Sequence, residues 1–120
     1  MVIIPPPPRS SGRDTAKRRD TAKRRAARAS LAAVLWDDQG ARRLPREREL
    51  VEALQACDAR DVWWVCEASS AGPVYLLPTR EWIGALARLL DRLRVRRVLE
   101  VAAGDGFLSS CLQRARPKLE

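Results

Sequence analysis

Apolar residues recur along this chain at spacings that predict helices and short strands, and the clearest case is a helix over residues 79–93. The apolar side chains of this stretch follow one another at helical intervals, which places them on one face: Trp82, Ile83, Leu86, Leu89, Leu90 and Leu93. Thr79 directly follows Pro78, and threonine is a residue type that commonly caps a helix N-terminus.

A second helix is predicted over residues 45–57. Proline suits the first helical position, which Pro45 would occupy. Arg48 and Glu52 have the spacing of an ion pair on a helix surface. The apolar stripe of this helix consists of Leu50, Val51, Leu54 and Cys57. The Ala-rich residues 22–34 also favour a short helix, which would run into Leu31, Val34 and Leu35.

Two stretches between these helices have the composition of strands. Residues 62–68, with the sequence VWWVCEA, are rich in valine and tryptophan, and residues 74–77 read VYLL. The turn-prone sequence SSAG at residues 69–72 separates them. We therefore expect a β-hairpin here, with Trp63 and Trp64 on opposite faces of its first strand.

The last part of the chain reads as strand, turn and helix. The run Val98–Val101 is apolar except for Glu100, the turn at residues 102–106 consists of Ala, Ala, Gly, Asp and Gly, and a helix over residues 107–115 ends before Pro117. This order is the first unit of a doubly wound sheet, in which ligands lie beyond the carboxyl end of the strand. The predicted class is α/β, with an incomplete Rossmann-like unit of one strand and its flanking helices.

Charge divides the chain into a tail, residues 1–30, and a body, residues 31–120. The tail holds nine basic and two acidic side chains, a net charge of +7 out of +8 for the whole chain. It contains four consecutive prolines at residues 5–8 and the hexamer RDTAKR twice, at 13–18 and 19–24. Because these sequences have no apolar face, we expect a disordered tail.

The remaining composition limits the chemistry. The chain has no histidine, which removes the commonest general base and zinc ligand, and we expect no metal site. Its three cysteines are far apart and odd in number, which favours a reduced, cytoplasmic chain. A helix that spans a bilayer needs about 20 apolar residues, and no apolar run in this sequence approaches that length. We therefore expect no membrane contact.

The sequence VLEVAAGDG, residues 98–106, resembles the first motif of class I S-adenosylmethionine-dependent methyltransferases. That motif combines an apolar strand, an acidic residue near its end and a G-x-G-x-G turn. Glu100 matches the acidic position, and the three glycine positions are matched by Ala102, Gly104 and Gly106. The resemblance covers roughly residues 73–115 and departs from the pattern at Ala102.

The resemblance implies that S-adenosylmethionine is the cofactor and that these residues line its methionine and ribose side. Asp105, inside the turn, would either contact the cofactor or accept hydrogen bonds from the start of the following helix. A dinucleotide turn fits less well, because the last position of G-x-G-x-x-G is Ser109 or Phe107, depending on the register. The other interpretation is an ordinary turn between a strand and a helix.

Few residues follow the turn, so we expect the N-terminal part of a methyltransferase, truncated and inactive alone, with no calorimetrically measurable cofactor binding. The segment indicates neither a catalytic residue nor the methyl acceptor. The alternative is a small basic-tailed protein that contacts nucleic acid weakly through residues 9–28, where the glycine turn is incidental.

Overall fold

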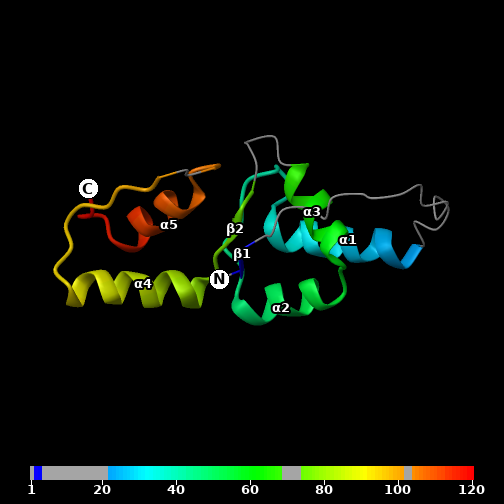
Figure 1. Cartoon of the computed structure of the whole chain (residues 1–120), viewed down its shortest axis with the longest axis horizontal. Coiled ribbons are helices and arrows are strands. Elements are labelled where there is room, and N and C mark those ends of the chain that lie inside the picture. The colour runs from blue at the N-terminus through cyan, green and yellow to red at the C-terminus, as the bar shows by residue number, and fades with distance from the viewer. Residues whose placement is uncertain (1, 4–21, 69–73, 102–103) are drawn as a thin grey trace, which may run out of the picture.

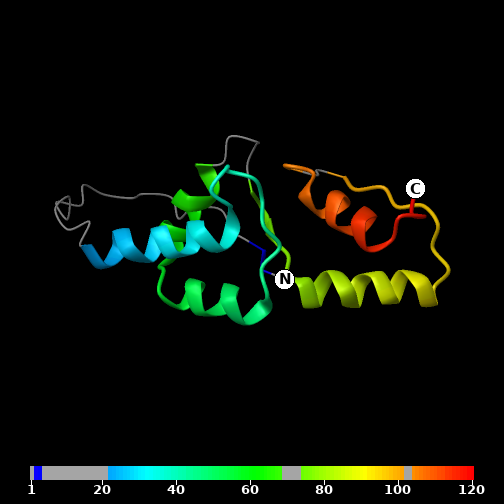
Figure 2. The same cartoon turned by 180° about the vertical axis from the view of Figure 1, so that it is seen from behind.

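The structure is a computed structural model that describes residues 2–3, 22–68, 74–101 and 104–120. Its described elements follow the chain as β1 (Val2–Ile3), α1 (Ala22–Leu35), α2 (Glu47–Gln55), α3 (Ala59–Glu67), β2 (Leu76–Leu77), α4 (Arg80–Arg92) and α5 (Phe107–Ala115). The molecule is elongated, with extents of 55 × 27 × 24 Å. Helices α1, α2 and α3 form one end, α4 and α5 form the other, and β1 and β2 lie between them (Figures 1 and 2).

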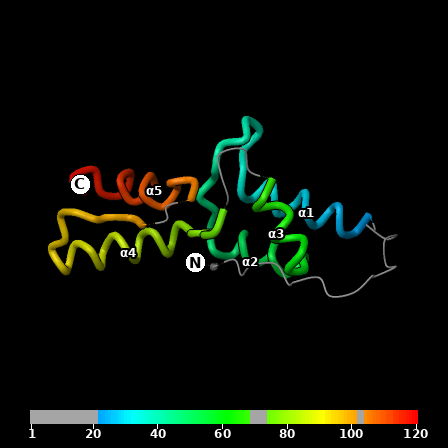
Figure 3. Tube along the Cα trace, turned by 45° about the horizontal axis from the view of Figure 1, so that its top comes forward, coloured from blue at the N-terminus to red at the C-terminus, as the bar shows by residue number. Residues whose placement is uncertain are grey.

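The main hydrophobic core lies among α1, α2 and α3. Helix α1 packs against both other helices, and the tube view shows the three side by side (Figure 3). Buried apolar side chains from these helices and from the β2 segment fill the space between them: Leu31, Leu35, Leu50, Ala53, Val65, Cys66, Val74 and Leu77. The predicted helix over residues 45–57 is confirmed as α2, including the Arg48–Glu52 ion pair at 3.4 Å.

The expected helix over the Ala-rich residues 22–34 is present as α1, so residues 22–30, which were also counted in the disordered tail, form its first part. Ala27 is buried in this part. The guanidinium groups of Arg24 and Arg28 form ion pairs of 2.9 and 2.6 Å with the buried carboxylate of Asp61 on α3. Helix α1 is therefore held to the core from its first turn onwards. The four prolines and most of the hexamer repeat lie outside the described residues.

The predicted strand over residues 62–68 is wrong, since this stretch belongs to α3. Asp58 caps the helix by accepting a hydrogen bond from the backbone N–H of Asp61 at 2.8 Å, and the Asp61 side chain bonds back to Asp58 N at 3.4 Å. Asp61 and Val65 are one helical turn apart, and both are buried. Capping and burial thus outweigh the weak β preference of valine and tryptophan.

The expected hairpin is replaced by a pairing between distant segments. Strand β2 confirms part of the predicted strand over residues 74–77, but its partner is β1, with Val2 opposite Leu77 and Ile3 opposite Leu76 in antiparallel register. The predicted hairpin turn at 69–72 lies outside the described residues. The pairing also places residues 2–3, counted in the expected disordered tail, in a strand.

The predicted helix over residues 79–93 is confirmed as α4, which packs against α5. Its cap is also confirmed, because the Thr79 hydroxyl accepts a hydrogen bond from Trp82 N at 3.2 Å. Helix α5 matches the predicted helix over residues 107–115.

The run Val98–Val101 forms no strand in the structure, contrary to the prediction of a buried one. Leu99 is 87% exposed and Val101 81% exposed. The backbone N–H of Val98 donates to Glu120 O at 2.8 Å, so the neighbouring chain is the C-terminal segment and not a sheet. A parallel strand needs a paired neighbour and cover on both faces, which the described residues do not supply here. The Rossmann-like assignment therefore stays a prediction.

Candidate functional site

The glycines of the turn before α5 adopt the left-handed conformation. Gly104 has φ = 59° and Gly106 has φ = 68°, and Gly106 is the N-cap residue of α5. Residues with a Cβ are strained in this region by about 1–2 kcal/mol, which explains the choice of glycine. A Cβ added at Gly106 would meet no atom within 4 Å, so there is open space beside this residue.

Glu100 lies next to the start of α5 and accepts a hydrogen bond from the backbone of that helix. Its Oε2 accepts a hydrogen bond from Ser109 N at 3.1 Å and a second, short one from the Ser109 hydroxyl. Negative charge is favourable at a helix N-terminus, where backbone N–H groups lack intrahelical partners. The acidic residue of the predicted motif thus reaches the start of the helix that follows the turn.

Asp105 accepts a hydrogen bond from the start of α5, which is one of the two roles predicted for it from the sequence. Its Oδ1 accepts a hydrogen bond from Phe107 N at 3.3 Å. Its Oδ2 forms a short ion pair with Nη1 of Arg42. The two side chains are only 8% exposed for Arg42 and 10% for Asp105, so the pair is almost wholly removed from solvent.

Arg42 was missed by the sequence analysis, yet it connects the glycine turn to the rest of the molecule. Its Nη2 donates to the carbonyl of Leu76 at 3.2 Å. Its guanidinium carbon lies 4.4 Å from the ring centroid of Phe107 and 5.9 Å from that of Trp36, both within the range of cation–π attraction. No local spacing could have shown this contact, because Arg42 and Asp105 are 63 positions apart.

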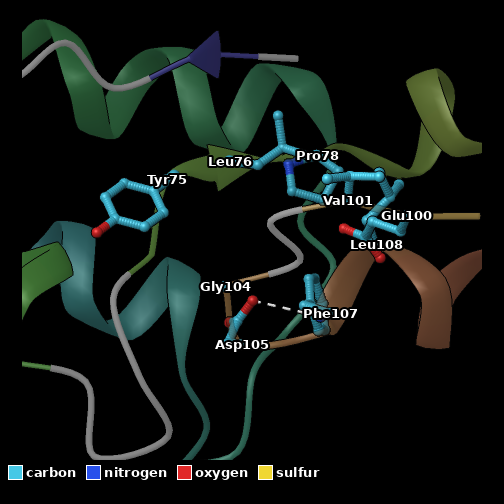
Figure 4. Close-up of a pocket in the computed structure, with 9 residues that line it drawn as sticks. All are labelled: Tyr75, Leu76, Pro78, Glu100, Val101, Gly104, Asp105, Phe107 and Leu108. Carbon is cyan, nitrogen blue, oxygen red and sulfur yellow. Dashed lines mark hydrogen bonds between the residues drawn. The ribbon is translucent and has the colours of Figure 1, made fainter.

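A pocket of about 240 Å³ opens between the β2 segment and the turn (Figure 4). The close-up shows Tyr75 across the pocket from Gly104 and Asp105. The lining residues are Tyr75, Leu76, Pro78, Glu100, Val101, Gly104, Asp105, Phe107 and Leu108. Ala102, the remaining residue of the predicted site, lies outside the described residues.

This pocket fits S-adenosylmethionine only in part. Pockets that enclose a drug-sized ligand measure about 300–1,000 Å³, so the volume here suits one end of such a molecule. The open space beside Gly106 permits close approach of a ligand to the backbone. The carboxylates of Glu100 and Asp105 already have protein partners. Among the described residues, no second strand carries an acidic residue toward the pocket.

The basic stretch proposed for nucleic-acid contact is partly engaged within the fold. Of residues 9–28, the structure describes 22–28, which include Lys23, Arg24, Arg25 and Arg28. Arg24 and Arg28 bind Asp61. Nucleic-acid contact by the whole stretch stays a prediction, since residues 9–21 lie outside the described part.

Possible metal ligands, helix length and thiols also bear on function in the described part of the chain. No group of three or more His, Cys, Asp or Glu side chains there is arranged to hold a metal ion. None of its helices combines the length and apolarity required to cross a bilayer. Cys57, Cys66 and Cys111 are free thiols, and burial raises the pKa of each, to about 11 for Cys66. Thiols of raised pKa are poor nucleophiles at neutral pH.

Comparison with known proteins adds no family to these observations: no family model matches the chain, and no significant match was found among curated proteins or solved structures.

Proposed function

We propose that the turn at residues 104–106 forms part of an S-adenosylmethionine site in a methyltransferase-like chain. The observation that carries the proposal is the pair of left-handed glycines beside a pocket that also receives Glu100. Backbone without side chains can approach a ligand closely, and this is the role that glycines have in nucleotide-binding turns. The motif resemblance of residues 98–106 supports the choice of cofactor.

In this proposal the chain's own residues position the turn, and they do not carry the reaction. Glu100 and Asp105 hold the start of α5, and Arg42 holds Asp105. The bound cofactor would supply a methyl group on a sulfonium centre, whose transfer depends mainly on the alignment of donor and acceptor. We assign neither a general base nor an acceptor class.

Binding by this 120-residue chain should be weak, because the pocket takes only one end of the cofactor. We expect a Kd of about 1 mM or higher, which corresponds to a binding free energy no more favourable than about −4 kcal/mol. Two-dimensional ¹H–¹⁵N NMR detects such binding where calorimetry does not. Titration with S-adenosylmethionine should shift the amide signals of Gly104, Gly106 and Ser109.

Gly106→Ala provides the decisive variant, and Gly40→Ala is its matched control. Both glycines have positive φ, 68° and 78°, and a Cβ at either meets no atom within 4 Å. Both substitutions therefore carry a similar backbone strain, but only Gly106 belongs to the turn. The expected result is loss of the titration shifts in Gly106→Ala and their retention in Gly40→Ala. Equal shifts in the two variants, or no shifts in the unmodified chain at about 5 mM cofactor, would refute the proposal.

A further inference from the structure

Phe107 also borders a second pocket, which lies between α4, α5 and the segment that contains Arg42 and Leu44. Its volume is about 320 Å³, within the about 300–1,000 Å³ of small-molecule pockets. Its apolar lining includes Ile83 of α4 and Cys111 of α5, both buried. The pocket is thus large enough for a short apolar chain and offers it a suitable surface.

Three arginines line the same pocket, and none of its described lining residues is acidic. Arg42 is paired with Asp105, but its Nε is buried without a hydrogen-bond partner. Arg80 uses its Nε to donate to Leu44 O at 2.8 Å, and no partner is found for its terminal nitrogens among the described residues. Arg114 has no ion-pair or hydrogen-bond partner among the described residues. The acidic groups near these arginines are Asp105, which pairs with Arg42, and Glu81, whose pKa is lowered first by backbone hydrogen bonds and then by the nearby charges of Arg46 and Arg80.

The pKa of the Cys111 thiol is influenced by two of these arginines. Burial raises its pKa, and Asp105 adds to this, while the positive charges of Arg114 and Arg42 act in the opposite direction. Two of the three lining arginines are therefore close enough to influence a group on the apolar wall. A ligand lying on that wall would therefore be within reach of the charges of Arg114 and Arg42.

We propose that this pocket binds a small amphipathic carboxylate. The apolar part of the ligand lies against Ile83, Phe107 and Cys111, and the carboxylate meets the guanidinium groups of Arg80 and Arg114. A guanidinium presents N–H donors in a planar fork that matches a carboxylate, and such charge-assisted bonds are stronger than neutral ones. The ligand proposed for this pocket differs from the cofactor proposed for the glycine turn, and this proposal does not depend on the other.

The test is NMR or calorimetric titration of the full chain with octanoate, with octanamide as the neutral probe of the same length. We expect octanoate to bind about tenfold more tightly than octanamide, as a charge-assisted hydrogen bond contributes about this factor. Arg114→Gln and Arg80→Gln should each weaken octanoate binding by about tenfold. Arg48→Gln is the matched control, because the Arg48 side chain lies on α2 and is 88% exposed.

A second variant tests the apolar part without a change of charge. Gly84 lines the pocket, and a Cβ there would approach only the flexible end of Arg88, at 3.3 Å. Gly84→Leu places a bulky side chain at the wall of the pocket and should weaken octanoate binding while the helical circular dichroism is retained. The proposal is overturned if octanoate and octanamide bind equally, if Arg48→Gln weakens octanoate as much as Arg114→Gln, or if the unmodified chain does not bind octanoate at about 5 mM.

Discussion

Substitution of Arg42 by methionine should destabilise the protein far more than the same substitution of an exposed arginine. Methionine retains an unbranched apolar stem like that of arginine but removes the guanidinium group. Asp105 would then remain as an unpaired carboxylate that is 10% exposed. Removal of one member of a buried ion pair costs about 3–5 kcal/mol, mainly because the other charge is left without compensation.

The expected loss is a large part of the total, since domains of this size are stable by about 5–15 kcal/mol. With a urea dependence of about 2 kcal/mol/M, a loss of about 4 kcal/mol lowers the unfolding midpoint by about 2 M. Urea titrations followed by circular dichroism of the helices measure this shift. Arg48→Met is the matched control, because the exposed Arg48–Glu52 pair on α2 contributes only about 0.3–0.5 kcal/mol.

A double-mutant cycle of Arg42→Met with Asp105→Asn separates the pair from the ring contacts of Arg42. Asparagine retains an oxygen that can accept the hydrogen bond from Phe107 N. We expect a coupling energy of about 1–3 kcal/mol between the two positions. Additive effects within about 0.5 kcal/mol, or a cost of Arg42→Met no greater than that of Arg48→Met, would refute the assignment of a buried ion pair.

Two further predictions concern acid stability and thiol reactivity. Burial of Asp61 favours its neutral form, but hydrogen bonds from Arg24 and Arg28 outweigh this and leave the pKa of the carboxyl below its ordinary value. Its stabilising effect is therefore present above the unfolded pKa of about 3.9 and is lost as the pH falls through the lower folded pKa. Urea midpoints at pH 5 and pH 3 should differ more for the unmodified chain than for Asp61→Asn, and an equal difference would contradict the assignment. Because burial raises the pKa of Cys66 to about 11, this thiol should react with Ellman's reagent at pH 8 only slowly until urea unfolds the chain; rapid reaction of all three thiols in the native state would contradict its burial.

Local sequence signals were sufficient wherever a helix has a clear apolar stripe. The predicted helices over 45–57, 79–93 and 107–115 correspond to α2, α4 and α5, and Thr79 caps α4 as expected. Gly104 and Gly106, which the sequence placed in a turn before a helix, both have positive φ in the structure. Their proposed relation to S-adenosylmethionine remains to be tested by the titration described above.

Only the tertiary structure determined the elements that depend on distant partners. The stretch over 62–68 has a composition typical of strands, but it belongs to α3, which packs against α1 and buries Asp61 and Val65. Strand β2 pairs with β1 across more than 70 positions, although a neighbouring partner was expected. Val98–Val101 has the composition of a buried strand but no paired neighbour in the described structure, and it remains exposed.

The sequence by itself therefore determined the helices α2, α4 and α5 and the place of the glycine turn, because periodicity, capping and positive φ act within a few residues. The tertiary structure determined which distant residues contact the turn. Arg42 and Asp105 come together only when α1, β2 and α5 are packed, and a buried ion pair between positions this far apart leaves no periodic signal in the sequence. The same physical reason applies to both pockets, whose walls come from segments that are distant along the chain.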